Sequence, residues 1–305
     1  MTKPRILITG ASGFIGTILI SSIAPYYEVW AITGKSSVIA KGVAHHLQVD
    51  LTRAEAVEIL RSSLPTEPFY AVLHIAACTP RCGEKRLEAF LAANTLGTEK
   101  LLMGFKVKPL RFAYFSTVDV YGHPGIDDVK TEGSSVAPAS YYAISKYAGE
   151  RVALRWCTDN KIPNSVFRLG QVYGPDDPTG KVIAAFCADA AAGRSPKIYG
   201  TGDDMRQPIH VQDVVGALAA WLQMPVFQES KMFLLVGRER VSIRELAYII
   251  SHLAGLSAAP QIEACEILHR IDYLFDAEYT EKELQWSPAM TLRVGITELL
   301  KKLAG

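Results

Sequence analysis

A tyrosine and a lysine stand four residues apart in the segment YYAISK, residues 141–146, and such a pair can do acid–base chemistry. On a helix, residues i and i+4 lie on the same face, so Tyr142 and Lys146 would be neighbours and Glu150 would continue the stripe. A phenol has an unperturbed pKa of about 10, and an ammonium one turn away lowers it toward the range useful for catalysis. The same spacing also fits a surface ladder of tyrosine, ammonium and carboxylate. The pair alone does not decide between these interpretations.

A second candidate site lies near the N-terminus, where ITGASGFIG (8–16) places Gly10, Gly13 and Gly16 between a strand-like run and a helical run. Glycines at such a turn let the backbone approach a pyrophosphate closely, and the helix N-terminus adds N–H groups and partial positive charge. The spacing is G-x-x-G-x-x-G, which differs from the usual G-x-G-x-x-G fingerprint. Its place between a strand and a helix still predicts a dinucleotide site.

The end of the second expected strand, EVWAIT (28–33), lacks the acid that usually holds the ribose of NAD. Thr33 stands there, followed by the polar run GKSS (34–37). No acid repels a 2′-phosphate, and Lys35 with two serines can bind one, so we expect NADPH (NADP) to be favoured over NAD. The alternative is that this run is simply a polar turn.

These candidates need a scaffold, and the first half of the chain alternates short β-branched runs with helical runs. We expect strands at 5–9, 28–33, 70–76, 111–116 and 164–169, and helices at 14–24, 52–63, 83–105 and from 141. The alternation predicts an α/β fold with a Rossmann-type, doubly wound parallel sheet. From about residue 171, loops rich in Gly, Pro and Asp break the rhythm. We therefore expect a dinucleotide-binding domain of residues 1–170, to which 211–237 returns, and a smaller C-terminal substrate-binding lobe of 171–210 and 238–305.

The composition is ordinary for a globular protein: 305 residues, 49% hydrophobic, 21% charged, with a formal net charge of +1. Near-neutral charge gives no reason to expect nucleic acid or a membrane surface as a partner. Cys78 and Cys82 form a C-x₃-C pair without a second pair to complete a metal site, so we expect no metal and reduced cysteines. No signal-like apolar region and no membrane-length apolar run is present, which favours a cytoplasmic protein.

Further motifs lie between the glycine loop and the tyrosine–lysine pair, and after that pair. They are VDL (49–51), HIAA (74–77), NTLGTEKLL (94–102), FSTVDVYG (115–122), FRLGQVYGP (167–175), RQPIHVQD (206–213) and ELQWSP (283–288). In this order they resemble the extended short-chain dehydrogenase/reductase family (NAD-dependent epimerase/dehydratase family), the group of nucleotide-sugar epimerases, dehydratases and ketoreductases. The resemblance covers nearly the whole chain, with Gln285 standing where the family usually has glycine.

The resemblance implies roles for individual residues. Tyr142 is the expected catalytic tyrosine, Lys146 its partner, and Thr117 the hydroxyl that orients the substrate oxygen. Asp119 is an acid/base, a hydroxyl-binding group or a cap of the following turn, and these alternatives stay open. Val118 stands where the sugar dehydratases have an aspartate, which argues against 4,6-dehydration.

The resemblance also implies two sets of binding residues. The expected cofactor residues are Gly10, Ser12, Gly13, Phe14, Ile15, Gly16, Thr33, Lys35, Asp50, Leu51, Ala76, Ala77, Asn94, Tyr142 and Lys146. The expected substrate residues are Thr79, Thr117, Asp119, Gln171 and Arg206. Arg206 would contact the nucleotide diphosphate, a role that suits its planar fork, and Gln171 stands where an asparagine is common. His210 and Asp213 are expected to be structural.

We therefore expect an NADPH-dependent 4-ketoreductase acting on a nucleotide-linked keto-sugar. The alternatives are a nucleotide-sugar epimerase that retains its NAD(P), and a non-catalytic NADPH-binding protein, although members of that kind usually lose the tyrosine or the lysine. The family often dimerises through a four-helix bundle, and the apolar faces of residues 86–103 and 143–157 permit such a homodimer here.

Overall fold

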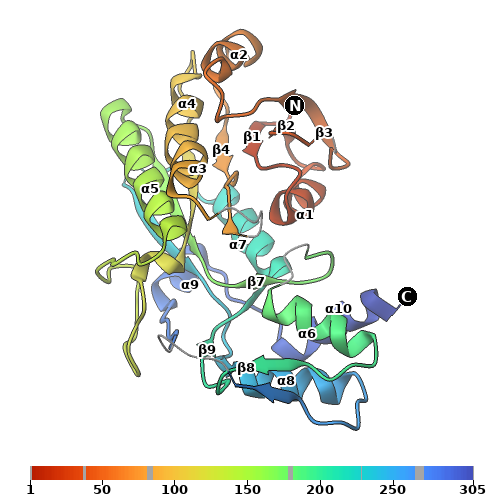
Figure 1. The fold of residues 1–305 in the computed structure, drawn as a ribbon. Helices are drawn as coiled ribbons and strands as arrows, with labels where there is room; N and C mark the ends of the chain where they lie inside the picture. The colour runs from red at the N-terminus through yellow and green to blue at the C-terminus, as the bar shows by residue number, and fades with distance from the viewer. Residues whose placement is uncertain are drawn as a thin grey trace. The chain divides into compact units, whose positions relative to one another are not determined.

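The computed structural model describes residues 2–36, 39–80, 85–177, 181–227, 229–264 and 271–304. The chain divides into two compact units (Figure 1). The first consists of Met1–Gly122, Val136–Leu169 and Ala217–Phe233, and the second of His123–Ser135, Gly170–Gly216 and Leu234–Gly305. Ser37, Cys82 and Cys265 lie outside the described residues.

A seven-stranded sheet with the order β11-β6-β5-β4-β1-β2-β3 organises the first unit. Its strands are β1 (Arg5–Thr9), β2 (Glu28–Thr33), β3 (Val43–Gln48), β4 (Ala71–His74), β5 (Phe112–Thr117), β6 (Asn164–Leu169) and β11 (Lys231–Leu235). Neighbours from β3 to β6 pair in parallel, with Ile6 opposite Val29 on one side and Ala71 on the other. The predicted Rossmann-type parallel sheet is confirmed.

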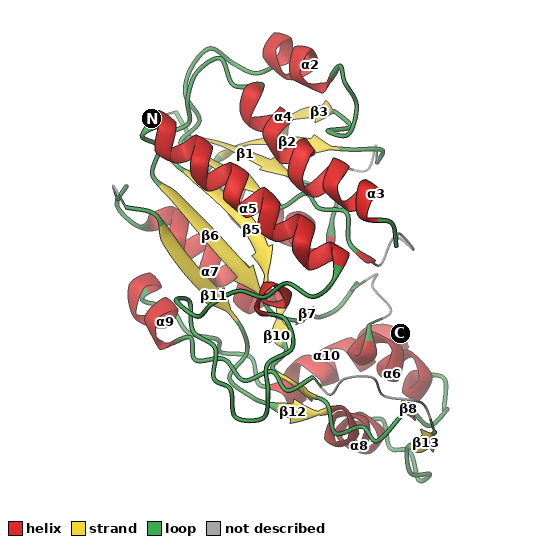
Figure 2. Ribbon diagram, turned by 60° about the vertical axis from the view of Figure 1, so that its left-hand side comes forward, coloured by secondary structure: helices red, strands yellow, loops and turns green. Residues whose placement is uncertain are grey.

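Helices cover both faces of this sheet. They are α1 (Phe14–Ile23), α2 (Ala56–Ser63), α3 (Leu87–Leu91), the π-helical turn η2 (Ala92–Leu96), α4 (Gly97–Met103), the 3₁₀ turn η3 (Val118–Tyr121), α5 (Tyr141–Asn160) and α7 (Val211–Gln223). Figure 2 shows α3, α4 and α5 in front of the strands and α7 behind them. Because both faces are covered, the central strands are near-continuous apolar runs: every residue of β4 and β5 is buried.

Two details of the first unit differ from the sequence prediction. The strand β3 was not expected, because VAHHLQ has polar residues and its side chains are half-buried or exposed at the sheet edge. The single helix expected over 83–105 is interrupted in its described part by the π-turn η2. One extra residue per turn there leaves the apolar spacing almost unchanged, so periodicity does not reveal it.

The second unit contains a helical core and short strand pairs. Its helices are α6 (Val182–Ala191), α8 (Ile243–Leu253), α9 (Glu278–Leu284) and α10 (Leu292–Ala304). Its strands are β7 (Val172–Tyr173), β8 (Lys197–Tyr199), β9 (Met205–Arg206), β10 (Ile209–His210), β12 (Val241–Ser242) and β13 (Gln261–Glu263). Ile183, Leu246 and Ile296, one from each of α6, α8 and α10, are packed in its core. Ser242 and Glu245 form a capping box that fixes the start of α8.

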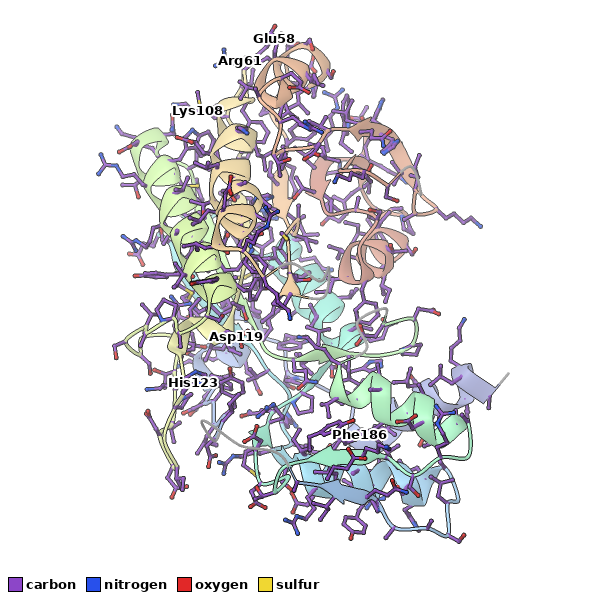
Figure 3. The ribbon with its side chains drawn as sticks, in the orientation of Figure 1. Glu58, Arg61, Lys108, Asp119, His123 and Phe186 are labelled. Atoms are coloured by element: carbon purple, nitrogen blue, oxygen red, sulfur yellow. The ribbon has the colours of Figure 1, made fainter. Side chains whose placement is uncertain are left out.

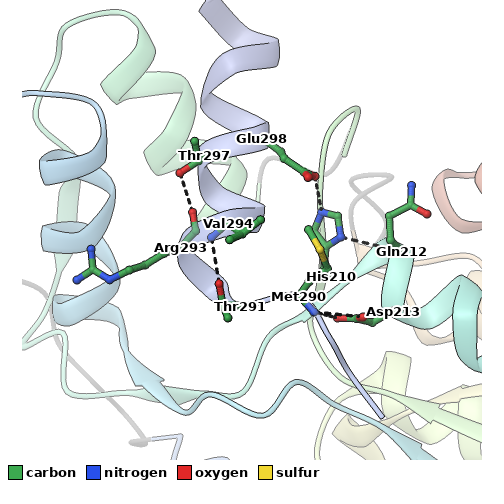
Figure 4. A network of polar contacts seen from close by, with 9 residues as sticks. All are labelled: His210, Gln212, Asp213, Met290, Thr291, Arg293, Val294, Thr297 and Glu298. Carbon is green, nitrogen blue, oxygen red and sulfur yellow. Dashed lines mark hydrogen bonds and ion pairs between the residues drawn. The ribbon is translucent and has the colours of Figure 1, made fainter. Parts of the chain in front are cut away.

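His210 and Asp213 lie in a polar network of the second unit (Figure 4). The carboxylate of Asp213 accepts hydrogen bonds from the backbone N–H groups of Ala289 (2.9 Å) and Met290 (3.2 Å). The buried imidazole of His210 lies 3.7 Å from the carboxylate of Glu298, and burial lowers its pKa. These contacts hold the chain that leads into α10. In the described part of the chain, no helix combines the length and the apolar character needed to cross a membrane.

Candidate active site

The glycine turn between β1 and α1 is tightly packed. Gly10 has φ +71°, and a Cβ there would come within 2.7 Å of the backbone nitrogen of Ala76. A Cβ on Gly16 would come within 2.3 Å of the carbonyl oxygen of Gly10, which accepts the N–H of Gly13 at 2.9 Å. The N-cap residue of α1, Gly13, makes no side-chain capping bond. The first N–H groups of α1 are therefore not capped by that residue, in a backbone cradle of the kind that fits a pyrophosphate.

A chain of buried hydrogen bonds ties this turn to the neighbouring strand and helix. The Thr9 hydroxyl accepts the N–H of Ala76 (3.1 Å) and meets Nδ1 of His74 (2.7 Å), while Nε2 of His74 meets the Thr98 hydroxyl (2.9 Å). Thr98 in turn donates to the carbonyl of Asn94 (2.8 Å). Only one assignment satisfies every partner: Thr9 donates to a neutral His74, which donates to Thr98. Burial lowers the pKa of His74 to about 3, in agreement with the neutral form.

Asn94 joins the segment after β4 to helix α5. Its side-chain oxygen accepts the N–H of Cys78 (2.7 Å), and its amide group donates to the carbonyl of Cys78 and to the Ser145 hydroxyl, both at 2.9 Å. Ser145 donates to the carbonyl of Tyr142 (2.8 Å). Both amide hydrogens of Asn94 are thus used inside the protein, so this side chain acts on the site by positioning these segments. The π-turn η2 brings Asn94 to this place.

The predicted adenosine side of the site lies at the ends of β2 and β3. The Thr33 hydroxyl meets the carbonyl of Ser36 (2.6 Å) and Nε2 of His46 (2.8 Å), while the side chain of Lys35 is exposed. Asp50 accepts hydrogen bonds from the hydroxyl (2.7 Å) and N–H (3.0 Å) of Thr52. The bond from the Thr52 hydroxyl, the largest of several causes, lowers the pKa of Asp50 and keeps it an acceptor.

The first turn of α5 carries the tyrosine–lysine pair. Ser140 caps the helix by accepting the N–H of Ala143 (3.1 Å). Tyr142 is half-buried with its ring edge against Phe90, whereas Tyr141 is 53% exposed. The structure therefore brings Tyr142, and not its neighbour, into the packed interior.

Lys146 is only 1% exposed. Its Nζ atom lies 4.4 Å from the centre of the Tyr114 ring and has no hydrogen-bond partner among the described residues. Burial lowers the pKa of Lys146 to about 7, and the charge of Glu150 partly opposes this effect. A buried amine without a partner is costly for folding, so a ligand group that accepts a hydrogen bond would fit this position.

Thr117 ends β5 and caps the turn η3. Its hydroxyl oxygen accepts the N–H of Asp119 (3.2 Å), which leaves the hydroxyl hydrogen to donate elsewhere. Asp119 is half-buried and lies in that turn (Figure 3). Ser116, the neighbour that precedes Thr117, is buried, and its hydroxyl has no hydrogen-bond partner among the described residues.

The remaining predicted residues fall in both units. Ser12, Phe14 and Ile15 are half-buried at the start of α1, and Ala77 and Thr79 follow β4. Leu51 follows Asp50 and lies beside the position of a Cβ on Gly97 (3.3 Å). The residues of the first unit thus gather at the carboxyl ends of β1, β2, β4 and β5, where open α/β sheets bind ligands.

Gln171 and Arg206 belong to the second unit. The guanidinium of Arg206 donates to Asp204 (3.0 Å) and to the carbonyl of Met205 (2.9 Å), and lies 5.7 Å from the ring of Tyr273. Gln171 is half-buried, and its backbone carbonyl accepts a hydrogen bond from the backbone N–H of Ile209 (3.0 Å).

Sequence reasoning gave no role to Thr9, His74 or Thr98. His74 and Thr98 stand inside the motifs HIAA and NTLGTEKLL, so their positions were available. The hydrogen bonds among these residues could not be predicted, because they join positions that lie 24 and 65 residues apart in the sequence.

Fold and site together define a class of protein. It is the class of doubly wound dinucleotide-binding proteins that carry a tyrosine–lysine pair on a helix packed against the sheet. The model of the NAD dependent epimerase/dehydratase family matches residues 6–237, so the chain belongs to that family. It is an enzyme of the extended short-chain dehydrogenase/reductase type.

The chain is similar to dTDP-glucose 4,6-dehydratase of Mycobacterium tuberculosis, with 26% identity over 302 residues that cover 94% of this chain and 89% of that relative. Among solved structures, MoeE5 in complex with UDP-glucose and NAD is 26% identical, with a TM-score of 0.82 and 98% of each chain covered. The UDP-glucose 4-epimerase of Thermotoga maritima has a TM-score of 0.86 over 98% of each chain at 22% identity, a likeness of fold.

Proposed function

We propose that this protein is an NADPH-dependent reductase of a nucleotide-linked keto-sugar, acting at C4. One observation carries the cofactor preference: Thr33 occupies the end of β2, where an acid would hold an NAD ribose. The Thr117, Tyr142 and Lys146 set expected for the reaction is complete in the same chain. The exposed ammonium of Lys35 next to Thr33 suits a 2′-phosphate.

The described residues fit a bound dinucleotide. The cradle at Gly10 and Gly16 has no room for a Cβ and leaves backbone N–H groups for the pyrophosphate. The buried Nζ of Lys146 is left to donate to hydroxyls of the nicotinamide ribose. These two features would hold the middle of the predicted cofactor and the ribose of its nicotinamide half.

When bound, the reduced nicotinamide supplies a hydride to the keto carbon. Tyr142 donates its phenolic proton to the carbonyl oxygen as negative charge develops there. The Thr117 hydroxyl, which already accepts from Asp119, donates a hydrogen bond to the same oxygen and orients it. Lys146 favours the phenolate that Tyr142 becomes, and so lowers the barrier to proton transfer.

Val118 and Asp119 distinguish this chain from the dehydratases that it resembles. An apolar side chain at 118 has no proton to give or take, so the elimination of water from the sugar lacks one of its expected acids. Asp119 lies two residues after Thr117 and is proposed to bind a sugar hydroxyl. Arg206 and Gln171 are proposed to bind the nucleotide diphosphate.

An epimerase that retains its dinucleotide is the second candidate function. The same three residues would serve it, and structural neighbours support it, because MoeE5 and the UDP-glucuronic acid 4-epimerase of Bacillus cereus were solved with NAD bound. The difference between the two functions is whether the cofactor leaves after each turnover.

Fluorescence titration of the cofactor-stripped protein with NADPH and NADH tests the proposal. We expect tighter, exchangeable NADPH binding, with NADPH consumed when keto-sugar nucleotides are supplied. Lys35→Ala should weaken NADPH binding and leave NADH binding unchanged, since only NADPH carries the 2′-phosphate. Equal dissociation constants, or NAD that stays bound through stripping, would overturn the cofactor preference and favour the epimerase.

A homodimer formed by the helices around α4 and α5 is part of the proposal. Leu96 and Met103 on the η2–α4 run, and Tyr141 and Ile144 on α5, are exposed apolar side chains. Sedimentation of wild-type protein and of the Met103→Glu, Ile144→Glu variant tests it: we expect a dimer and a monomer respectively.

A further inference from the structure

A buried ion pair lies one helical turn beyond Lys146. The carboxylate of Glu150 accepts hydrogen bonds from Nη2 (2.7 Å) and Nε (3.3 Å) of Arg168, and both side chains are almost fully buried. The contact joins α5 to β6 and is bidentate. One of the two interpretations left open by the sequence, a surface ladder that includes Glu150, does not apply, because Glu150 is 1% exposed.

Arg168 extends this pair toward the turn that carries Asp119. Its Nη1 donates to the hydroxyl of Tyr121 (2.9 Å), and its guanidinium lies 4.9 Å from the centre of the same ring. Tyr121 is the last residue of η3. The pair is therefore fixed from three elements, which limits its freedom to reorient.

Glu150 is also the neighbour of Lys146 on helix α5. Residues four apart on a helix have Cβ atoms about 6 Å apart, so the carboxylate acts on the amine at short range in a buried setting. Among the described residues, Tyr114 on β5 lies against the amine, and Glu150 on α5 and His74 on β4 interact with its charge. Tyr142 precedes Lys146 by one turn of α5. Burial keeps Tyr114 and His74 neutral near pH 7, so neither compensates the ammonium.

We propose that Glu150 and Arg168 are positioning residues that set the charge of Lys146 where it meets the cofactor. The carboxylate of Glu150 favours the charged ammonium form of Lys146. The guanidinium of Arg168, paired with that carboxylate, limits the effect of Glu150 on Lys146. This rests on the proposed placement of Lys146 against the nicotinamide ribose. The ion pair is an expensive way to stabilise a core, because an apolar pair of the same volume often does as well. The position of this ion pair, one helical turn from the amine of Lys146, indicates a role at the candidate site.

The proposal predicts shifts of opposite sign from the two halves of one ion pair. Glu150→Gln removes the compensating charge and leaves Arg168 facing Lys146, so Lys146 should lose its proton at lower pH. Arg168→Met frees the full charge of Glu150 to act on Lys146, so the proton should be held to higher pH. A purely structural pair would instead show the same damage from both substitutions.

The experiment is calorimetric titration with NAD at a series of pH values. NAD carries the nicotinamide ribose and lacks the 2′-phosphate, a group that itself titrates at about pH 6. The lower break in log Kd plotted against pH reports the proton on Lys146 in the free protein, and we expect it at about pH 7 in the wild type. Above it, loss of a charge-assisted hydrogen bond should weaken binding by about five- to tenfold.

We expect the break to move down by about 1–3 pH units in Glu150→Gln and up in Arg168→Met, as for other charges at this separation. Asp159→Asn is the matched control, because Asp159 pairs with Arg155 (2.9 Å) on the exposed side of the same helix; its break should stay in place. Shifts of one sign, or no shift, would overturn the proposal.

A double variant keeps the test decisive if a single substitution prevents folding. Glu150→Gln with Arg168→Met leaves no unpaired buried charge. Because Glu150 is the charged group that opposes the effect of burial on Lys146, the break should still lie below that of the wild type, and an unmoved break would refute the proposal. Since NAD is the probe, a failed NADPH preference leaves this result intact, whereas a wild-type Kd without any break removes the inference and leaves the preference standing.

Discussion

Replacement of Gly10 by alanine tests whether the turn after β1 is the backbone cradle of a cofactor site. Gly10 has φ +71°, a conformation that costs an L-residue about 1–2 kcal/mol. The new Cβ would also lie 2.7 Å from the nitrogen and 2.9 Å from the Cα of Ala76, both backbone atoms that cannot rotate away. Such overpacking adds about 1–3 kcal/mol.

The two terms together predict a loss of about 2–5 kcal/mol in the free energy of unfolding of the first unit. For a chain of this length that corresponds to a fall of about 3–8 °C in Tm. Binding should suffer more, because the same clash displaces the N–H of Ala76 from Thr9 and moves the turn against α1. We expect NADPH affinity to fall by more than about tenfold, since a misplacement of about 1 Å has effects of this order.

Differential scanning calorimetry and NADPH titration measure both effects. Gly133→Ala is the matched control, because a Cβ at that position meets nothing within 4 Å and its φ is not in the left-handed region. It should leave Tm and Kd unchanged. A Gly10→Ala variant with a Tm within about 1 °C of the wild type and normal NADPH binding would refute the reasoning.

Further substitutions test other parts of the structure. Tyr142→Phe should abolish turnover and leave NADPH binding nearly intact, since only the phenolic oxygen is lost; full activity would remove its assignment. Thr117→Val should lower kcat by about 10²–10³-fold with little change in NADPH Kd, because one donor to the reacting oxygen is gone. Arg111→Met should cost about 3–5 kcal/mol in denaturant unfolding, because it leaves without this donor the carbonyls of Trp221 (3.0 Å), Leu222 and Met224 (3.1 Å) at the end of α7, to which the fully buried guanidinium donates. Lys146 has its pKa lowered to about 7 on folding from 10.5, so the unfolded chain binds more protons between these values and wild-type stability should rise with pH there. Lys146→Met should raise Tm at pH 7 and lack that rise.

The scaffold could be predicted because its strands are buried on both faces. Runs such as RILIT and RFAYFS consist almost entirely of buried residues, so composition alone marks them. The strand β3 has no such signal. It pairs with β2 alone, with a register shift between Val29 and Trp30. The ring of His45 stacks on the ring of Trp30, with the ring centres 4.0 Å apart. Its place depends on a tertiary contact that no local pattern contains.

The candidate site was predictable to the extent that its residues are close in sequence. Tyr142 and Lys146 share a helix, so their spacing indicates their contact. Glu150 shares that helix too, yet its spacing could not show whether it is buried, because a carboxylate four residues after a lysine also fits a solvated surface pair. Its burial depends on Arg168, which stands 18 positions away on β6. Helical periodicity gives the face of a residue and not what covers that face.

Lys146 shows why such a site persists in a fold that it weakens. Its amine is fully buried beside a neutral tyrosine, and burial alone would favour a methionine of similar length at this position. Glu150 reduces that cost, but Glu150 needs Arg168, and Arg168 needs the hydroxyl of Tyr121, so one buried charge requires three further polar side chains. Four residues from α5, β6 and η3 are thus committed to keeping one ammonium in the interior. Stability does not explain that commitment, whereas a ligand that needs a charged donor at this point does.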